Sequence, residues 1–252
     1  MLYRGLVIMA VLCCTLACCA VMPAAVIAQS QEPLWQAGIY VVGKAGYNMG
    51  NTSVTASQLS LNTIPECGLL ARYAPEPTIV ALELQAGLTT YSAHSFSNDP
   101  FNNGTRLTDF RLHAQLHAIG LTAMLELYQW LGIGFTYAVP LRGHYVSTVD
   151  VFNRGQQYAA EQTFDFDRAS FRDVIELRLQ SRIVNVQLPV GAIAFFIGGS
   201  YTLSAIAVPA SNPQRLYAPN MNQIGLDPLA GLRTFSMQPL SVMLGAKYLI
   251  GL

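Results

Sequence analysis

The residues of this chain best suited to chemistry are its four histidines and the serines near them. Two of the histidines have a serine three positions later, in the pairs His94 with Ser97 and His144 with Ser147. A histidine beside a serine can activate the hydroxyl for attack on an ester. On a strand, however, residues three apart point to opposite faces. The sequence therefore predicts no catalytic residues and no enzyme.

The other two histidines and one cysteine are candidates for metal binding or thiol chemistry. His113 and His117 are four positions apart, which on a strand separates them by about 13 Å, too far to share a metal ion. We expect both to pack inside the fold. Cys67 stands beside a glycine at the start of a predicted strand. We expect it to be a small buried residue without reactivity.

Three aspartates form the densest group of oxygen ligands. Asp165, Asp167 and Asp173 lie close together in the sequence, and calcium prefers clustered carboxylates. Arg168 and Arg172 lie among them and can neutralise them. We expect a solvated loop here. No cofactor and no metal site are predicted.

The composition narrows the class of protein. The chain of 252 residues is 52% hydrophobic and only 11% charged, with 14 basic against 14 acidic residues. An ordinary soluble domain carries roughly 25% charged residues. Disorder is excluded because it needs low hydrophobicity and high charge. The neutral balance offers no basic surface for nucleic acid. Two classes remain: a globular domain with unusually few charges, or a protein whose outer surface faces lipid.

The first residues resemble an export signal. A single basic residue precedes a long apolar run, and small residues lead to Ala28. This pattern is typical of a secretory signal peptide. We expect residues 1–28 to be a cleaved signal peptide and residues 29–252 to be the mature domain. A retained membrane helix, or lipidation at Cys18 or Cys19, remains as an alternative.

The rest of the chain alternates between apolar and polar or small residues with a period of two, which is typical of strands with two unlike faces. Eight such segments occur, at about 34–48, 66–74, 78–91, 108–127, 131–141, 174–188, 190–208 and 237–252. Short turns alternate with long polar stretches at about 49–65, 92–107, 142–173 and 209–236. This asymmetry is typical of outer-membrane barrels, with short periplasmic turns and longer external loops. The predicted fold is all-β, an eight-stranded antiparallel up-and-down transmembrane β-barrel.

The direction of the two faces separates a membrane barrel from a soluble one. The polar faces carry too few charges to coat an exterior, and the interior of an eight-stranded barrel is just wide enough for side chains. We therefore place the polar faces inside, where Gly38, Gly46, Gly132 and Gly134 relieve crowding. The expected lumen network consists of Lys44, Glu83, Arg111, Arg178 and Lys247.

Two features fit the barrel less well. Residues 190–208 are free of charge and long enough for a transmembrane helix, although glycines and flanking prolines favour a strand. Four polar residues also fall on apolar faces: Glu126, Ser181, Asn185 and Gln187. Either bulges shift the alternation there, or these positions lie at the membrane interface.

Several segments resemble a known group of proteins. The stretch from Gly38 to Asn48 (GIYVVGKAGYN), the segment Pro65-Glu66-Cys67 and the closing stretch from Gly245 to Leu252 (GAKYLIGL) are similar to small outer-membrane barrels of the PorT and OmpA/OmpX-like kind. The resemblance implies eight strands, with both termini in the periplasm. Such barrels often end in an aromatic residue that is read by the barrel-assembly machinery, whereas this chain ends in Leu252.

The function expected from these features is a structural or surface-interaction role in the bacterial outer membrane. Four long loops would face outward above a lumen filled by side chains. The expected partners are the lipid bilayer, the barrel-assembly machinery, and lipopolysaccharide phosphates bound by loop arginines. The alternatives are a lipid-modifying enzyme and a narrow channel or binder of a small apolar ligand.

Overall fold

The computed structural model describes residues 33–49, 59–62, 64–76, 79–101, 106–153, 156–204 and 236–252. The predicted signal peptide, with its alternatives at Cys18 and Cys19, lies outside the described residues. So does most of the predicted loop at 209–236.

The described residues form strands almost throughout. The strands are β1 (Trp35–Met49), β2 (Leu59–Leu61), β3 (Glu66–Glu76), β4 (Val80–Phe101), β5 (Arg106–Leu127), β6 (Leu131–Asn153), β7 (Gln156–Asp167), β8 (Val174–Gln187), β9 (Ala192–Thr202) and β10 (Ser236–Gly251), with a short 3-10 turn, η1 (Arg168–Ser170), before β8. Within the described ranges, no helix is both long enough and apolar enough to span a bilayer.

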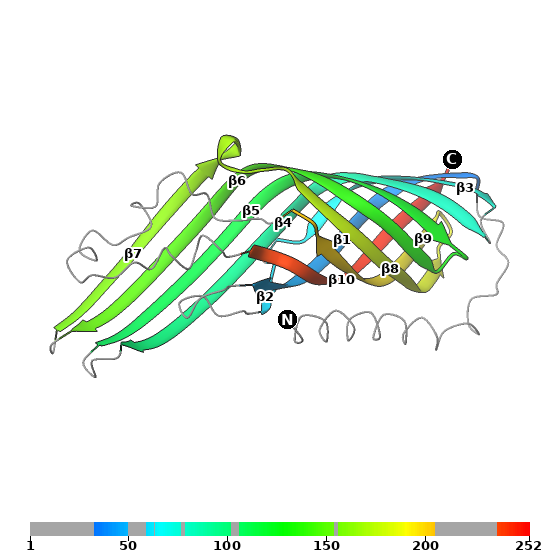
Figure 1. Cartoon of the computed structure of the whole chain (residues 1–252). Coiled ribbons are helices and arrows are strands. Elements are labelled where there is room, and N and C mark those ends of the chain that lie inside the picture. The colour runs from blue at the N-terminus through cyan, green and yellow to red at the C-terminus, as the bar shows by residue number, and fades with distance from the viewer. Residues whose placement is uncertain are drawn as a thin grey trace.

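Eight of the strands close into a barrel (Figure 1). The hydrogen-bonded order is β10-β9-β8-β6-β5-β4-β3-β1, and β1 pairs with β10 from Gln36↔Gly251 to Tyr47↔Leu240. Every pairing is antiparallel, and the eight strands correspond to the eight predicted segments. The predicted fold is confirmed. The helical alternative for residues 190–208 is wrong, because β9 lies between β8 and β10 in the wall.

Three strands are much longer than a membrane crossing requires. β4, β5 and β6 have 22, 22 and 23 residues, whereas about 9–11 tilted residues suffice. β6 pairs with β8 over Leu131–Ala138 and with β7 over Arg142–Asn153. The sheet β4–β7 therefore projects beyond the barrel (Figure 1). The prediction of loops at 92–107 and 142–173 is therefore largely wrong, since most of both stretches is strand.

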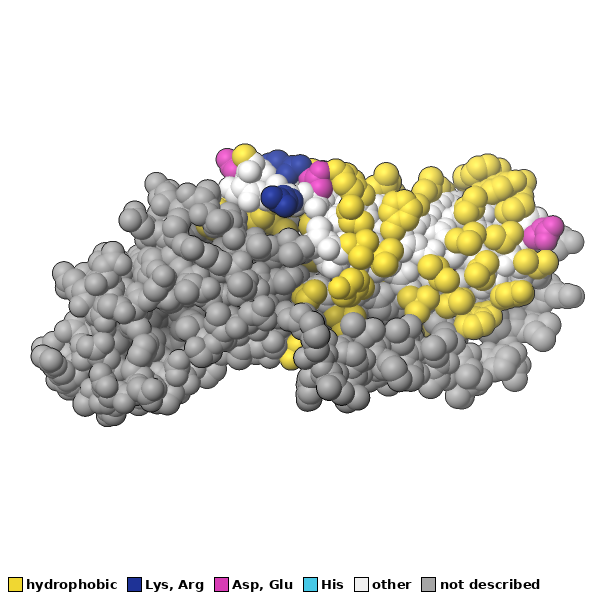
Figure 2. Space-filling view, in the orientation of Figure 1, with side chains coloured by type: hydrophobic (Ala, Val, Ile, Leu, Met, Phe, Trp, Pro, Cys, Tyr) yellow, Lys and Arg dark blue, Asp and Glu magenta, His cyan; other side chains and the backbone are white. Residues whose placement is uncertain are grey.

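The two faces of the barrel wall are of opposite character. In β8, Glu176 and Arg178 are buried while Ile175 and Leu177 are exposed. Figure 2 shows hydrophobic side chains spread over the wall, with the charged groups of this view near its ends. We call the exposed apolar positions of the wall the belt; they include Leu69, Leu82, Leu84, Leu88, Ile119, Leu121, Ile133, Phe135, Phe195, Val242 and Leu244. This arrangement is the reverse of a soluble barrel.

The chemical character of the two faces reverses along β5, while the same positions stay buried. Its buried positions are Ala114, Leu116 and Ala118 towards the projecting sheet, and Thr122 and Glu126 towards the turns. The opposite face carries Ile119 and Leu121 in the belt, but His113 and His117 beyond it. The prediction that these histidines pack in the lumen is wrong. The same positions face outward along the whole of β5, but their side chains are apolar in the belt and polar beyond it.

Bulges explain part of the irregular alternation. Arg182 pairs with Phe196 and Val184 with Phe195, so Ile183 is an extra residue in β8. Beyond it, Val184 and Val186 take the exposed positions, which moves Asn185 to the other face. Glu126 needs no bulge. It lies on the interior face of β5, to which the sequence pattern had assigned the wrong direction.

The β5–β6 turn provides a test of backbone strain. Tyr128 and Gln129 have φ values of 53° and 65°, a left-handed conformation that costs a non-glycine residue about 1–2 kcal/mol. We expect Gln129→Gly to raise the free energy of unfolding by about 0.5–1 kcal/mol, because glycine loses part of the gain to its greater unfolded-state entropy.

The measurement is urea unfolding of the protein in lipid vesicles. Gln187→Gly, at an exposed position of regular strand, is the matched control and should destabilise. Equal changes in the free energy of unfolding for the two substitutions would contradict backbone strain at Gln129.

Candidate functional site

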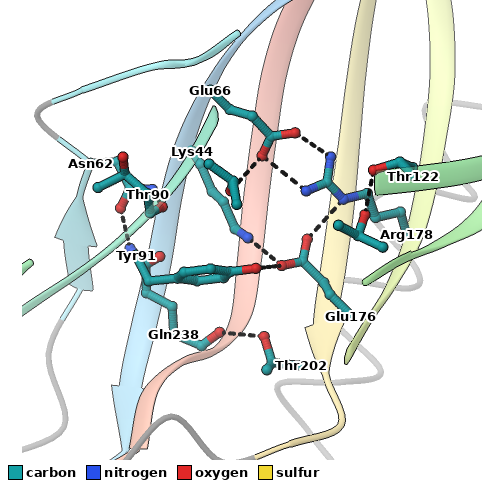
Figure 3. Close-up of polar contacts among 12 residues, drawn as sticks. Lys44, Asn62, Glu66, Thr90, Tyr91, Thr122, Glu176, Arg178, Thr202 and Gln238 are labelled. Carbon is teal, nitrogen blue, oxygen red and sulfur yellow. Dashed lines mark hydrogen bonds and ion pairs between the residues drawn. The ribbon is translucent and has the colours of Figure 1, made fainter. Parts of the chain in front are cut away.

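The lumen holds a cluster of four ion-paired residues near the projecting sheet, which we call the loop-end cluster: Lys44, Glu66, Glu176 and Arg178 (Figure 3). The Nζ of Lys44 lies 2.6 Å from Oε2 of Glu176. The Nε of Arg178 donates to Oε1 of Glu176 at 2.9 Å, and its two terminal nitrogens donate to Glu66 at 2.6 and 2.9 Å. Two cations thus face two carboxylates.

Hydroxyl groups complete this cluster. Tyr91 donates to Oε2 of Glu176 at 3.2 Å, and Thr89 donates to Oε2 of Glu66 at 2.9 Å. The ammonium group of Lys44 also lies 4.5 Å from the centre of the Tyr91 ring. The strands β1, β3, β4 and β8 each contribute one or two of these side chains from inward positions. Lys44 with Glu176 and Arg178 with Glu66 are paired across the lumen, whereas Arg178 and Glu176 are paired along β8.

A second group, the turn-end cluster, lies at the opposite end of the lumen; it consists of Arg72, Glu83, Glu126, Arg182 and Lys247. The Nζ of Lys247 is 2.7 Å from Glu83 and 3.5 Å from Glu126. Glu126 also accepts from Arg72 at 2.7 Å and from Arg182 at 3.1 Å. Three cations face two carboxylates here.

An apolar layer fills the same lumen; it consists of Tyr40, Val42, Leu70, Phe196, Met243 and Leu249. Packing is tight. A Cβ on Gly132 would lie 2.8 Å from both Sδ of Met124 and Cγ of Gln180. The described part of the barrel is therefore a filled interior rather than a water-filled pore, as an eight-stranded barrel allows.

A polar cap covers the loop-end cluster. Gln238 is fully buried, and its Nε2 donates to Oδ1 of Asn62 at 2.6 Å. Asn62 in turn donates to the carbonyl of Thr90, and Thr202 donates to the carbonyl of Gln238 at 3.2 Å. Gln238 has a φ of 43°, so a strained backbone at the start of β10 directs this amide inward.

Four of the five residues expected in the lumen are buried in it. Lys44 and Arg178 belong to the loop-end cluster, and Glu83 and Lys247 to the turn-end cluster. They form two networks instead of one. Arg111 lies in β5 beyond both clusters, and its side chain is outside the described residues.

The sequence reasoning missed five members of the clusters: Glu66, Arg72, Glu126, Glu176 and Arg182. Glu176 could have been found, because it shares its face with Arg178. Arg182 could also have been found, because it precedes the bulge at Ile183 and keeps the inward parity of Glu176 and Arg178. The sequence pattern predicts the wrong face for Glu126, which is buried in the lumen.

The remaining candidates for chemistry lie outside the lumen or outside the described side chains. His144 pairs through Nδ1 with Oδ1 of Asp165 at 2.8 Å on the exposed face of the projecting sheet. Arg168 pairs with Asp173, which also accepts from Tyr137. The expectation that Cys67 is buried is wrong, because it is exposed on β3. Among the described residues, no group of three or more His, Cys, Asp or Glu could hold a metal ion.

His117 lies just beyond the belt, two residues from Ile119. Partial burial, followed by the positive charges of Arg142 and His144, lowers the pKa of its imidazole from the ordinary value. His117 is therefore more often neutral than an isolated histidine at the same pH. The side chains of His94, Ser97 and Ser147 lie outside the described residues.

Comparison with known proteins yields similarity in structure only. No protein-family model and no curated protein sequence matches the chain. Ail, the attachment invasion locus protein of Yersinia pestis, is 14% identical, with a TM-score of 0.33 over 87% of this chain and 99% of that one. CarO of Acinetobacter baumannii is 12% identical, with a TM-score of 0.28 over 81% of this chain and 96% of that one. The barrel assignment rests on the strand pairing of this chain itself. The PorT and OmpA/OmpX-like resemblance stays a prediction.

The pairing of Lys247 with Glu83 can be tested by a double-mutant cycle. Lys247→Met leaves a buried carboxylate without its main partner, which we expect to lower the free energy of unfolding by about 3–5 kcal/mol. Lys247→Met combined with Glu83→Gln should recover much of this loss, because no unpaired charge remains. The measurement is urea unfolding in vesicles.

The exposed Arg172 supplies the control, since Arg172→Gln should change the free energy of unfolding by less than about 0.5 kcal/mol. A double variant as unstable as the sum of its single variants would show that the two side chains do not interact.

Proposed function

We propose that this protein is an integral barrel of a bacterial outer membrane with a structural or surface-interaction role. The observation that carries the proposal is the belt. Its side chains are large, apolar and exposed, for example Leu84 at 56%, Leu121 at 56% and Leu244 at 63%. Soluble monomers rarely expose contiguous apolar surfaces larger than a few hundred Å². A lipid bilayer is the solvent that suits such a wall.

Aromatic residues support the same placement. Trp35, Tyr73 and Trp130 lie near the short turns, and the rings of Trp35 and Tyr73 are 4.5 Å apart. Tyr137 and Tyr201 are exposed near the other edge of the belt. Membrane barrels carry aromatic girdles at both interfaces. The belt between the two groups would then span the hydrocarbon.

The lengths of the connections support an orientation of the barrel. The connections β3–β4, β5–β6 and β8–β9 are short and lie at the end that holds Trp35 and Leu252. Periplasmic turns are short in such barrels. We therefore place the termini in the periplasm and the projecting sheet β4–β7 outside the cell. This orientation agrees with the predicted signal peptide.

The projecting sheet favours a surface-interaction role over the alternatives. It presents charged and polar side chains above the belt, including the His144–Asp165 pair and the exposed Arg142 and Arg172. Lipopolysaccharide phosphates remain a candidate contact for these arginines, and the barrel-assembly machinery remains the expected route of insertion. A lipid-modifying enzyme is the second candidate, because a His–Asp pair lies close to the lipid surface.

The membrane assignment has a direct test in the belt. Leu84→Arg places a cation in the hydrocarbon and should cost about 2–4 kcal/mol of unfolding free energy in vesicles. Thr163→Arg, on the exposed face of β7 beyond the belt, is the matched control and should cost close to nothing. Similar costs at both positions would contradict the lipid exposure of the belt.

Cell fractionation tests the location. The full-length protein should be recovered with the outer membrane and should migrate differently on a gel when unheated than when boiled. Recovery as a soluble periplasmic protein without a mobility shift would overturn the proposal.

The filled lumen leads to a separate expectation for conductance. Because ion pairs and apolar side chains occupy the interior, the purified protein in a planar bilayer should show no stepwise channel currents. Reproducible unitary currents would favour the channel alternative instead.

A further inference from the structure

A β-bulge lies in β6 at the point where the belt ends. His117 pairs with Arg142, whereas the neighbouring pair joins Ala118 to Pro140, so Leu141 is an extra residue in β6. Pro140 is buried, and a regular strand would therefore also bury Arg142, two positions later. Arg142 is exposed instead. Bulges re-aim side chains and occur next to functional sites, so the bulge turns this arginine from the inner face to the outer face.

The re-aimed arginine stands at the height of the lipid headgroups. His117, its partner across the ladder, lies two residues beyond Ile119 of the belt, which is about 7 Å along a strand. A headgroup layer is about 5–7 Å thick on each side of the hydrocarbon. Figure 2 shows the arginine and lysine side chains of this view at one end of the belt rather than within it. Arg142 and His117 therefore project into the layer that holds lipid phosphates.

Arg142 has no ion-pair partner among the residues that the structure describes. The arginines of the lumen do have carboxylate partners: Arg72, Arg178 and Arg182. Asp167 lies opposite Arg142 in the ladder with β7, but the two side chains form no ion pair, and Ser170 donates to this carboxylate at 3.3 Å. The guanidinium of Arg142 is thus available to a ligand.

Two histidines stand beside this arginine. Partial burial, followed by the positive charges of Arg142 and His144, lowers the pKa of His117, which reflects the closeness of the three groups on one face. His144 is held through Nδ1 by Asp165 of β7 at 2.8 Å. A phosphate placed between β5 and β6 would lie about 7 Å from β7. The carboxylates of β7 therefore repel it less than Arg142 and His117 attract it.

A phosphate group suits these two side chains. A guanidinium donates two parallel N–H groups to phosphate oxygens, and an imidazole donates an N–H in either charge state. Directly opposed residues on adjacent strands have Cβ atoms about 4.5–5.5 Å apart, so Arg142 and His117 can reach the same phosphate. A lipid supplies acyl chains as well, and Ile119 and Leu121 of the belt continue the outer face of β5 below His117.

We infer that Arg142 and His117 bind the phosphate group of a membrane lipid. The acyl chains of this lipid would lie against Ile119 and Leu121 of the belt. The bulge at Leu141 creates the site by turning Arg142 outward. The inference rests on the proposed membrane function and assigns its lipid partner to one place on the wall.

Native mass spectrometry of the purified protein in a neutral detergent measures lipid binding directly. The lipids are phosphatidic acid and diacylglycerol with the same acyl chains, which differ only in the phosphate. One molecule of phosphatidic acid should bind saturably at concentrations where diacylglycerol does not bind. A large excess of inorganic phosphate should not displace it, because free phosphate makes no contact with the belt.

Three variants locate the site. Arg142→Gln should weaken the binding of phosphatidic acid about tenfold, as expected for the loss of a charge-assisted contact. His117→Leu should weaken it about threefold, as expected for the loss of one neutral hydrogen bond. Arg172→Gln is the matched control. It removes an exposed arginine that precedes β8, outside the β5–β6 ladder, and should leave binding unchanged.

Equal affinity of Arg142→Gln and its parent for phosphatidic acid would overturn the inference. Equal weakening by Arg172→Gln would do the same, since it would indicate a diffuse attraction to positive charge. Equal binding of diacylglycerol, or displacement of the lipid by inorganic phosphate, would overturn the assignment to a lipid phosphate. The heat-dependent gel shift tests the barrel separately. A protein that keeps this shift but binds no phosphatidic acid refutes the lipid site alone, whereas a parent protein without the shift refutes the membrane proposal.

Discussion

The structure depends on one electrostatic constraint: charges that are removed from water must meet partners within the same closed space. An apolar exterior leaves the lumen as the place for the polar faces of the barrel strands, and eight strands leave little room for water there. The two clusters satisfy this constraint by pairing side chains from strands on different sides of the barrel. The pairing also explains why a buried, highly polar interior coexists with close packing, because each guanidinium or ammonium group replaces water with carboxylate oxygens.

The same constraint divides the long strands into two regions. Within the belt, apolar side chains face outward and polar ones inward; beyond it, β5 reverses this order without any bulge of its own. The reversal needs no change in the backbone, since only the solvent on the outer side changes from lipid to water. The projecting sheet is therefore continuous with the wall, and its hydrogen bonds extend those of the barrel.

The difference between these two regions explains which parts of the fold could be predicted from the sequence. Period-two alternation was sufficient to place all eight wall strands, because each crosses the lipid with one apolar face. The direction of the faces was correct for Lys44 and Lys247 in the belt region and wrong for His113 and His117, where the surrounding solvent differs. The extensions of β4 to β7 were taken for loops because polar residues cover them. The pairing of Lys44 with Glu176 is invisible in sequence, since it joins positions 132 residues apart. The bulge at Ile183 conceals the direction of Asn185, which follows it, but not that of Arg182, which precedes it.

The separation of these partners along the chain has a consequence for the way the protein is assembled. β1 emerges first and carries Lys44, whereas Glu176 and Arg178 arrive with β8, after most of the wall has been made. Until β8 is in place, the first strands hold Lys44 and Glu66 without the ion-pair partners that β8 provides, Glu176 and Arg178. Insertion of a partly formed wall would bring these charges into lipid unpaired. Unpaired charges in lipid are avoided if the early and late strands associate before the chain leaves water or the assembly site. The barrel then enters the bilayer as a nearly complete ring.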